Sequence, residues 1–329
     1  MAVTSFGKRL LCEVGLTDLL WSLRPTGLYC FNFHRIGNRH DTEFDPCVFS
    51  CDSEHLEHYL RFINKHFEMI DIPELHGMIR QGKPLKKRYA LITFDDGYRD
   101  NYEFAYPILK SLNMRAAFFI STSLIGSATL PWWDEIAWYV KKCAGKNVKL
   151  PGYDEPVQIP ATITPDTIKS VLQSVKQNFD SLESLLANLH ELAGGDTPSY
   201  HSKSELFMNW QQLQELVDAG MTIGAHSHSH RILSYLSNQE LDFELSHSKA
   251  LLESKLGIDA NTLSYPVGGA HTYNEIVSRK ARELGYESAF SFSSKINHNI
   301  FENCMELGRF SIDRSFDRTF FKKMCLTSG

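Results

Sequence analysis

Short apolar runs recur along the chain, and a stretch with helical periodicity follows each of them. The runs are residues 28–33, 67–71, 89–94, 115–121, 221–225, 262–265, 287–292 and 307–312. Several are apolar almost throughout, which is typical of strands covered on both faces. Strand–helix alternation predicts an α/β fold with a parallel sheet and right-handed crossovers. About eight such strands predict a closed or nearly closed barrel.

One segment, residues 127–206, interrupts this alternation. It contains PWWDEIAWYVKK, a Gly/Pro-bearing stretch around 151–160 and a helical run near 167–193. We expect a mainly helical insertion within a barrel that spans residues 28–315, not a separate domain. Such insertions commonly form one wall of an active site or a lid. Residues 1–27 are expected to form an N-terminal amphipathic helix, and residues 316–329 a C-terminal tail.

Bulk composition argues against several classes of protein. The chain is 43% hydrophobic and 22% charged, as in ordinary globular proteins. A net charge of -5 without a run of Lys and Arg argues against nucleic acid as a partner. The seven cysteines are odd in number and scattered, which favours reduced thiols over a disulfide framework. The oligomeric state is not indicated.

The N-terminal stretch does not read as an export or membrane-spanning signal. Glu13 and Asp18 interrupt its apolar residues and Arg24 closes it, so it lacks the uninterrupted core of a signal peptide. It is also too short and too polar to span a bilayer. We therefore expect a cytoplasmic protein. The helix is expected to pack on the protein body, in preference to lying on a membrane surface, through apolar positions that include Leu10, Val14, Leu20 and Trp21.

Two adjacent carboxylates stand at the end of the third apolar run. Phe94 leads directly into Asp95, Asp96 and Gly97. Crowded carboxylates are costly unless a cation or a shared proton relieves them. The carboxyl end of a strand is where α/β proteins carry their chemistry. Taken alone, however, the two aspartates are slightly better explained as a turn followed by a helix cap than as a functional carboxylate pair.

A group of histidines follows the fifth apolar run. His226, His228 and His230 come directly after Ala225. On a helical turn, His226 and His230 would face the same way and could bind one metal ion, whereas His228 would point elsewhere. Two imidazoles and one carboxylate make a three-ligand site with an open position. The second carboxylate would then be free to act as a general base in hydrolysis.

The two motifs together resemble those of the polysaccharide deacetylases with a NodB homology domain, carbohydrate esterase family four. TFDDG stands at residues 93–97 and HSHSH at 226–230. The resemblance continues through ILKSLNMRAAFFIST, LSYPVGG and ELGYESAF, and covers about residues 28–314 apart from the insertion. It implies a distorted (β/α) barrel and a hydrolase that removes an N-acetyl group from a sugar.

The resemblance also implies a role for each motif residue. Asp95 would be the catalytic base, while Asp96, His226 and His230 would bind a divalent metal. Zinc is the expected ion, and Co, Ni or Fe would suit the same ligands. The metal would polarise the acyl carbonyl and lower the pKa of the water that attacks it, to about 7 in well-studied zinc hydrolases. A backbone N–H near Tyr265 would assist the metal in stabilising the oxyanion.

The sequence departs from the family pattern in two places. Many members carry an arginine two residues before Pro266, where it steadies the catalytic Asp, but Ser264 stands here. Arg309 on the last strand is the candidate to orient Asp95, and simple pairing on the barrel rim is an equally good interpretation. The late Leu-x-x-His motif, which supplies the general acid, is not evident after residue 285, and His298 follows no clear strand.

A histidine near the N-terminus offers a different general acid. Some family members are circularly permuted, and His34 at the end of the first strand resembles the acid of those members; a buried, hydrogen-bonded histidine is the alternative. Trp132 and Trp133 suit sugar rings, although core packing is the stronger interpretation. The site residues follow different strands at one end of the barrel: His34 the first, Asp95 the third, His226 the fifth and Pro266 the sixth.

Three other functions remain open at this point. A two-His, one-carboxylate site also suits non-haem Fe(II) oxygenases, although these usually have a double-sheet β scaffold. A sugar-binding protein with a dead site and, among hydrolases, a deformylase are the others. The glycan is not specified by the sequence. Without an export signal, a nucleotide- or lipid-linked sugar precursor is our working hypothesis.

Overall fold

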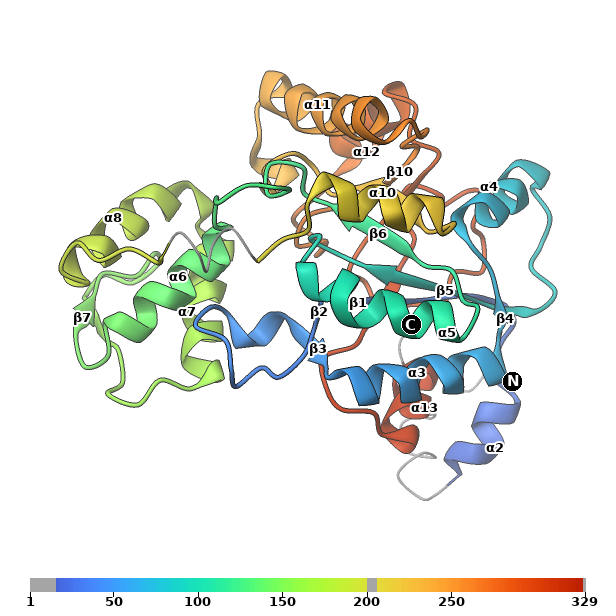
Figure 1. Ribbon diagram of the computed structural model, residues 1–329, viewed down its shortest axis with the longest axis horizontal. Coiled ribbons are helices and arrows are strands. Elements are labelled where there is room, and N and C mark those ends of the chain that lie inside the picture. The colour runs from blue at the N-terminus through green and yellow to red at the C-terminus, as the bar shows by residue number, and fades with distance from the viewer. Residues whose placement is uncertain (1–15, 200–205, 328–329) are drawn as a thin grey trace.

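The computed structural model describes residues 16–199 and 206–327, and seven parallel strands in it form a nearly closed barrel (Figure 1). Their order is β11–β10–β9–β6–β5–β1–β12, and β4 pairs with the first half of β5. All eight apolar runs therefore form strands. They are β1 (Gly27–Phe33), β4 (Glu68–Met69), β5 (Arg88–Phe94), β6 (Ala117–Ile120), β9 (Thr222–Ala225), β10 (Thr262–Ser264), β11 (Ser288–Phe290) and β12 (Arg309–Ser311).

The barrel closes through the segment that leads into β12. The Ala289 N–H on β11 donates to the Cys304 carbonyl at 2.8 Å, and the Leu307 N–H donates back to Ala289 at 2.9 Å. Phe290 and Leu307 form a parallel bridge. β12 then pairs with β1, which returns the ring to its first strand. The predicted distorted (β/α) barrel is confirmed.

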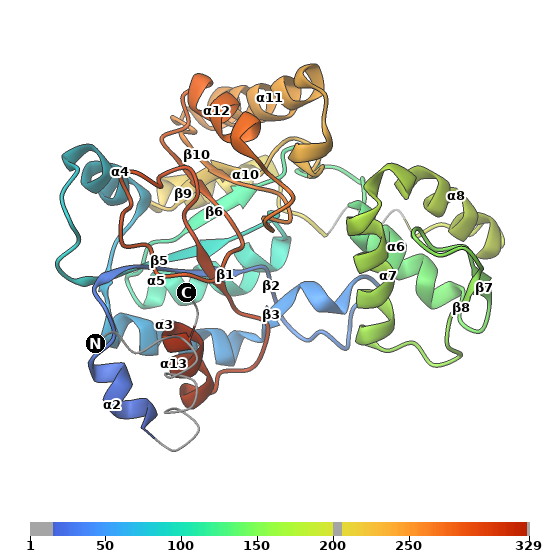
Figure 2. The ribbon, with the colours of Figure 1, turned by 180° about the vertical axis from the view of Figure 1, so that it is seen from behind.

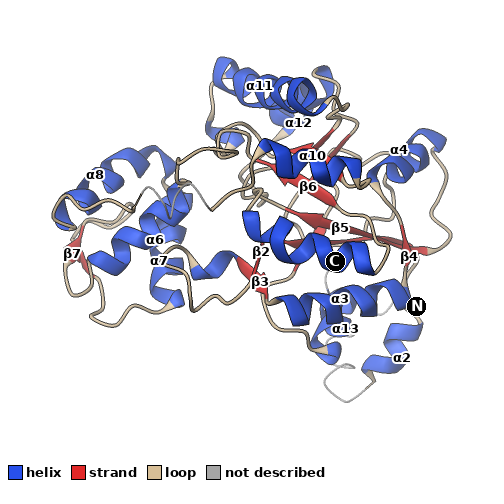
Figure 3. Ribbon diagram, in the orientation of Figure 1, coloured by secondary structure: helices blue, strands red, loops and turns tan. Residues whose placement is uncertain are grey.

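Helices surround the barrel (Figure 3). Asn209 and Ser237 each form a capping box at the start of the helix that follows. The helices outside the insertion are α2 (Thr17–Ser22), α3 (Ser53–His66), α4 (Ile72–Gln81), α5 (Tyr106–Ser111), α10 (Trp210–Asp218), α11 (Asn238–Leu256), α12 (Glu275–Glu283) and α13 (Arg318–Thr327). A π-helix, η2 (Asn101–Ala105), precedes α5.

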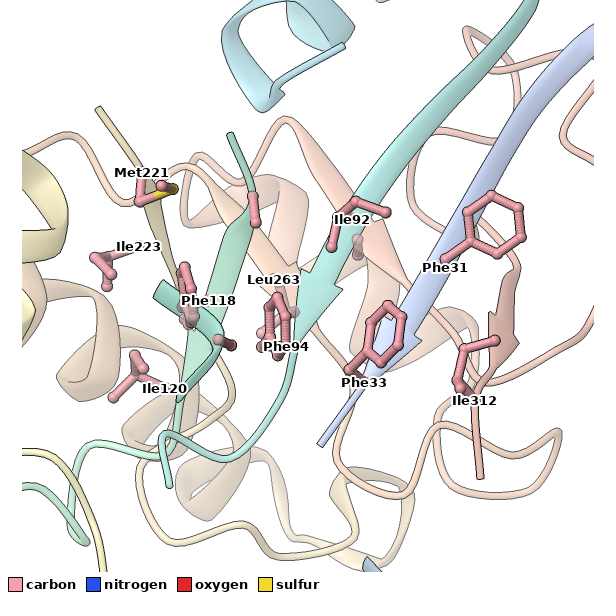
Figure 4. Close-up of a cluster of buried hydrophobic side chains, with 14 of the residues drawn as sticks. Phe31, Phe33, Ile92, Phe94, Phe118, Ile120, Met221, Ile223, Leu263 and Ile312 are labelled. Carbon is pink, nitrogen blue, oxygen red and sulfur yellow. The ribbon is translucent and has the colours of Figure 1, made fainter. Parts of the chain in front are cut away.

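Side chains alternate along the strands between the helical layer and the barrel interior. Phe33, Phe94 and Phe118 stack in series within the outer hydrophobic cluster, with centroids 5.3 and 5.0 Å apart (Figure 4). A separate apolar cluster that includes Leu91 and Phe119 fills the barrel interior. Toward the carboxyl ends of the strands the interior becomes polar, and the candidate site lies there.

The insertion forms a helical lobe beside the barrel (Figures 1 and 2). It has its own hydrophobic cluster, which reaches the barrel side through Phe44, Tyr98 and Phe207. Its elements are α6 (Trp132–Lys142), β7 (Asn147–Val148), β8 (Val157–Gln158), α7 (Pro165–Gln177), the 3₁₀ helix η3 (Phe179–Ser181) and α8 (Leu182–Leu192). The short strands β2 (Arg35–Ile36) and β3 (Phe49–Cys51) and the 3₁₀ helix η1 (Pro46–Val48) lie between lobe and barrel.

The two ends of the described chain pack together. Trp21 of α2 contacts Phe321 of α13, with ring centroids 6.2 Å apart, and both side chains are buried. The segment expected to be a tail thus carries a helix that packs on the barrel. Leu10 and Val14 of the predicted amphipathic helix lie outside the described residues. Over the part of the chain that is described, no helix has the length and apolarity needed to cross a bilayer.

Candidate active site

All of the predicted site residues except Arg309 and Pro266 line one cavity of about 130 Å³ between the barrel rim and the insertion. Barrel strands and the loops after them supply one side, and helices α6 and α7 of the insertion supply the other. The cavity is lined by His34, Asp45, Val48, Asp95, Asp96, Trp132, Trp133, Leu172, Lys176, His226, His230, Tyr265, Val267 and Phe292.

Three side chains in this cavity have the geometry of a metal site. The Nε2 atoms of His226 and His230 each lie 3.4 Å from Oδ1 of Asp96. The candidate ligand atoms of the three residues all lie within 4.8 Å of one another. The Nδ1 atom of His226 is 2.7 Å from the Ser264 carbonyl, which can only accept a hydrogen bond. The proton is therefore on Nδ1, and Nε2 keeps a lone pair for an ion.

The backbone that presents these ligands differs from the expected helical turn. Residues 226–230 are not helical. Ser227 and His230 instead have positive φ angles of 59° and 56°, and Asp96 has a φ of 75°. Non-glycine residues adopt this left-handed conformation only when their surroundings enforce it, and they cluster at functional sites. The Ser227 hydroxyl helps by accepting the His230 N–H at 3.0 Å.

His228 lies outside the ligand set, as the sequence predicts. Its Nδ1 lies 2.9 Å from the Thr122 hydroxyl, and its ring packs against His247 at 4.7 Å. Glu244 of α11 accepts the backbone N–H groups of both His228 and Ser229 at 2.8 Å. This buried carboxylate holds the ligand loop against the barrel, and nothing local in the sequence pointed to it.

Asp95 is paired with Arg309 at the base of the cavity. Nη1 of Arg309 donates to Oδ1 of Asp95 and Nη2 donates to Oδ2, both at 2.7 Å. The two side chains are 1–2% exposed. Arg309 also donates to the Ser264 hydroxyl at 2.8 Å and to the Asn32 side-chain oxygen at 2.9 Å. The guanidinium thus lies beside Ser264, the position where many family members have their arginine.

The charges around the two carboxylates keep both ionised. Burial raises the pKa of Asp95, but the Arg309 guanidinium and the His226 imidazole outweigh it, so the pKa lies below its ordinary value. Burial likewise raises the pKa of Asp96, but the adjacent imidazoles of His226 and His230 outweigh it and bring the pKa well below that value. An ionised Asp95 can accept a proton, and an ionised Asp96 can bind a cation.

Comparisons with known proteins agree with this geometry. Residues 82–289 match the family described as Polysaccharide deacetylase. The chain belongs to this family. Asp95, Asp96, His226 and His230 lie inside the matched residues, whereas His34 and Arg309 lie outside them.

A curated relative of this deacetylase-family chain is distant in sequence. It is 23% identical over 221 residues to the putative polysaccharide deacetylase YxkH of Bacillus subtilis (strain 168), which is 67% of this chain and 50% of that protein. The chain thus spans about half the length of this curated relative.

Solved structures show the same fold. A deacetylase from Streptococcus pyogenes, PplD, in complex with acetate has a TM-score of 0.58 at 16% identity, covering 91% of this chain and 99% of that one. A de-N-acetylase from Aggregatibacter actinomycetemcomitans has a TM-score of 0.56 at 14% identity, with 90% and 99% covered.

His34 of this deacetylase-family chain lies in the same cavity as Asp95 and Asp96. Its backbone is held on both sides: its N–H donates to the Ser50 hydroxyl at 2.9 Å, and its carbonyl accepts the Asn101 amide at 2.6 Å. Burial lowers the pKa of the imidazole, although the two carboxylates act in the opposite direction. The neutral ring can therefore take up a proton and release it. His298, by contrast, is exposed and lies beside Thr26, before β1, at the opposite end of the barrel.

The predicted substrate-binding residues divide into two groups. Tyr265 lines the cavity, but its hydroxyl donates to the Met305 carbonyl at 2.9 Å and its N–H to the Phe290 carbonyl at 3.0 Å. Pro266 is buried and does not line the cavity, where Val267 stands instead. The N–H of Tyr265 is thus committed to the barrel.

The two tryptophans of the insertion both line the cavity. Trp133 packs against His230 with centroids 4.3 Å apart, and its Nε1 donates to the Tyr98 hydroxyl at 2.8 Å. The Nε1 of Trp132 makes no hydrogen bond with any residue of the described chain. Trp133 therefore braces His230, whereas the Nε1 of Trp132 is buried and left without a partner among the described residues.

Two charged residues of the cavity were not predicted from the sequence. Lys176 comes from the last turn of α7, and Asp45 precedes the 3₁₀ helix η1. Neither lies at a strand end or in a family motif. Lys176 reaches the cavity only because the insertion folds back against the barrel rim, whereas Asp45 reaches it from the segment between β2 and η1.

Proposed function

We propose that this protein is a metal-dependent hydrolase that removes an N-acetyl group from a sugar. The observation that carries the proposal is the convergence of Asp96, His226 and His230 beside the Arg309-bound carboxylate of Asp95. Two imidazoles and a carboxylate suit zinc, with Co, Ni or Fe as alternatives. An oxygenase with the same ligands usually uses a double β sheet, so the parallel barrel favours hydrolysis.

The hydrogen bonding of His226 suits a divalent ion. The hydrogen bond from His226 Nδ1 to Ser264 leaves Nε2 aimed at Asp96. When bound, the ion would polarise the acyl carbonyl and make a coordinated water more acidic. The ligands themselves leave coordination positions open for water and substrate, as catalytic zinc sites do.

Asp95 is the proposed general base. Its two oxygens are each held by one nitrogen of the guanidinium, so the carboxylate can neither rotate nor drift from the attacking water. It accepts the proton of that water as the new C–O bond forms. Arg309 acts through Asp95 and is a positioning residue.

His34 is the proposed general acid for the leaving amine. Because burial keeps its imidazole neutral at rest, it must first receive the proton that Asp95 took from the attacking water. It then delivers that proton to the amine nitrogen as the C–N bond breaks, since an unprotonated amide anion is a very poor leaving group.

The backbone near Tyr265 supplies the proposed oxyanion donor. The Tyr265 N–H already donates to Phe290, and Pro266 has no N–H. The next residue, Val267, lines the cavity with a positive φ of 62°, and its N–H makes no hydrogen bond within the described chain. We assign the oxyanion contact to this N–H, where it would act together with the ion.

An acetate-release screen tests the proposal. N-acetylated monosaccharides, oligosaccharides and sugar phosphates are incubated with chelated protein and with protein reloaded with Zn, Co, Ni or Fe. We expect acetate only from the reloaded protein, and less with Asp95→Asn. Release of formate from N-formyl sugars alone would point to a deformylase. Sugar binding without any acyl release would point to a non-catalytic protein.

A further inference from the structure

Lys176 brings a positive charge from the insertion into the catalytic cavity. It lies in the last turn of α7, one turn after Leu172, and both side chains line the cavity. Among the cavity-lining residues of the described chain, it is the one lysine or arginine. Arg309, the cation beneath the cavity, is already bound to Asp95.

The ammonium of Lys176 has no partner of its own. No residue in the described part of the chain makes a hydrogen bond or ion pair with it. Burial lowers the pKa of Lys176, and this effect outweighs the carboxylates of Asp45 and Asp96, which raise it. Asp45 is itself engaged, because its Oδ1 caps η1 by accepting the Cys47 N–H at 2.8 Å. A partly buried cation without an ion pair is costly, so it favours an anion supplied from outside.

The rest of the insertion wall is apolar or aromatic. Leu172 and Trp132 stand on this side, and Val48 and Phe292 complete the apolar surface. Sugar rings suit such surfaces, and a single placed charge then sets orientation and specificity. The chemistry is supplied by the barrel, whereas the insertion adds recognition.

We propose that Lys176 binds an anionic group, a phosphate or a carboxylate, that the N-acylated sugar carries. This inference rests on the proposed function for its setting, since the anion would lie on the substrate of that same site. Lys176 is then the residue that selects charged over neutral sugars. A sugar phosphate and a sugar with a carboxylate side group both carry an anion that can pair with the ammonium of Lys176. Testing one substrate of each kind shows which anion the site binds.

Three substrates and two matched variants test the inference. The substrates are N-acetylglucosamine 1-phosphate, N-acetylmuramic acid and neutral methyl N-acetylglucosaminide. Lys176→Met removes the charge from the cavity, and Lys169→Met removes one from the exposed face of the same helix. A hydrogen bond to a charged group supports an effect on the order of 10- to 100-fold. We expect KM to rise by that factor for one anionic substrate in Lys176→Met, with kcat retained and the neutral substrate unchanged. Lys169→Met should behave as wild type.

Binding measured without turnover separates this inference from the proposed reaction. Glucosamine 1-phosphate and glucosamine are titrated into wild type, Lys176→Met and Lys176→Arg by calorimetry. The Kd of the phosphate should weaken in Lys176→Met and recover in Lys176→Arg. If Lys176→Met weakens charged and neutral ligands equally, or neither, or only lowers the unfolding temperature, the inference fails. If the phosphate needs Lys176 but no acyl group is released, the anion site stands and the proposed reaction fails.

Discussion

Replacing Arg309 with methionine removes the only cation bound to Asp95 in the described chain while keeping an unbranched side chain of similar length. Five side-chain and backbone groups lose a donor: Asp95, Ser264, Asn32, Thr93 and Ser291. Because the pair is 1–2% exposed, Asp95 would be left as an uncompensated buried charge. Removing one partner of such a pair costs about 3–5 kcal/mol. We expect a loss of that size in the free energy of unfolding.

A double-mutant cycle measured by urea denaturation isolates the pair. Asp95→Asn with Arg309→Met removes both charges, so its cost should fall short of the summed single costs by about 1–3 kcal/mol. Arg309→Lys keeps the charge but loses the bidentate contact with Asp95. We expect it to lower kcat clearly while the free energy of unfolding changes little. Additivity of the two single changes within about 0.5 kcal/mol would refute the idea that Arg309 holds Asp95.

Three further predictions concern Trp132 of the cavity wall, the proposed acid His34, and Asp134, a buried carboxylate of α6 that accepts the Asp45 N–H at 2.9 Å and the Tyr98 hydroxyl at 2.8 Å. Trp132→Ala should raise KM for sugars while the unfolding temperature changes little. A lower unfolding temperature with an unchanged KM would instead indicate core packing. His34→Ala should lower kcat by about 10²–10⁴ for an N-acetyl amide but much less for an activated acetate ester; equal slowing of both would exclude it as the acid. Burial raises the pKa of Asp134 to about 7 from 3.8. Protonated Asp134 therefore makes its full contribution to the free energy of unfolding below pH 3.8, and this contribution is lost as the pH rises through about 7. Asp134→Asn should flatten that pH dependence and be more stable at about pH 8 by up to about 4 kcal/mol, as urea denaturation at several pH values can check.

Much of the barrel could be predicted because its signal is local. An apolar run such as residues 89–94 is buried on both faces wherever it lies in the barrel, so its composition alone indicates a strand. The carboxylates and histidines directly after strand ends also had to meet, because parallel strands place their carboxyl ends at one rim. The C-terminal helix was missed although Phe321 and Cys325 sit one turn apart and are both buried.

The parts that sequence could not supply depend on tertiary contacts. The ligand loop was expected to be a helical turn from the spacing of His226 and His230. Instead the Ser227 hydroxyl holds the His230 N–H, and Glu244 of the next α-helix, α11, holds the N–H groups of His228 and Ser229. Lys176 reaches the cavity only through the packing of the insertion, and its position on α7 resembles any lysine near a helix end.

The central claim is that Asp96 binds the catalytic metal and Asp95 does not. Zinc content and acetate release are measured on the same preparations of wild type, Asp95→Asn and Asp96→Asn after dialysis against a chelator and reloading. Asp95→Asn should retain close to one zinc per chain while kcat falls by about 10²–10⁴. Asp96→Asn should lose zinc and activity together, with partial recovery of both at high zinc. Equal zinc retention by the two variants, or zinc loss in Asp95→Asn alone, would contradict the account.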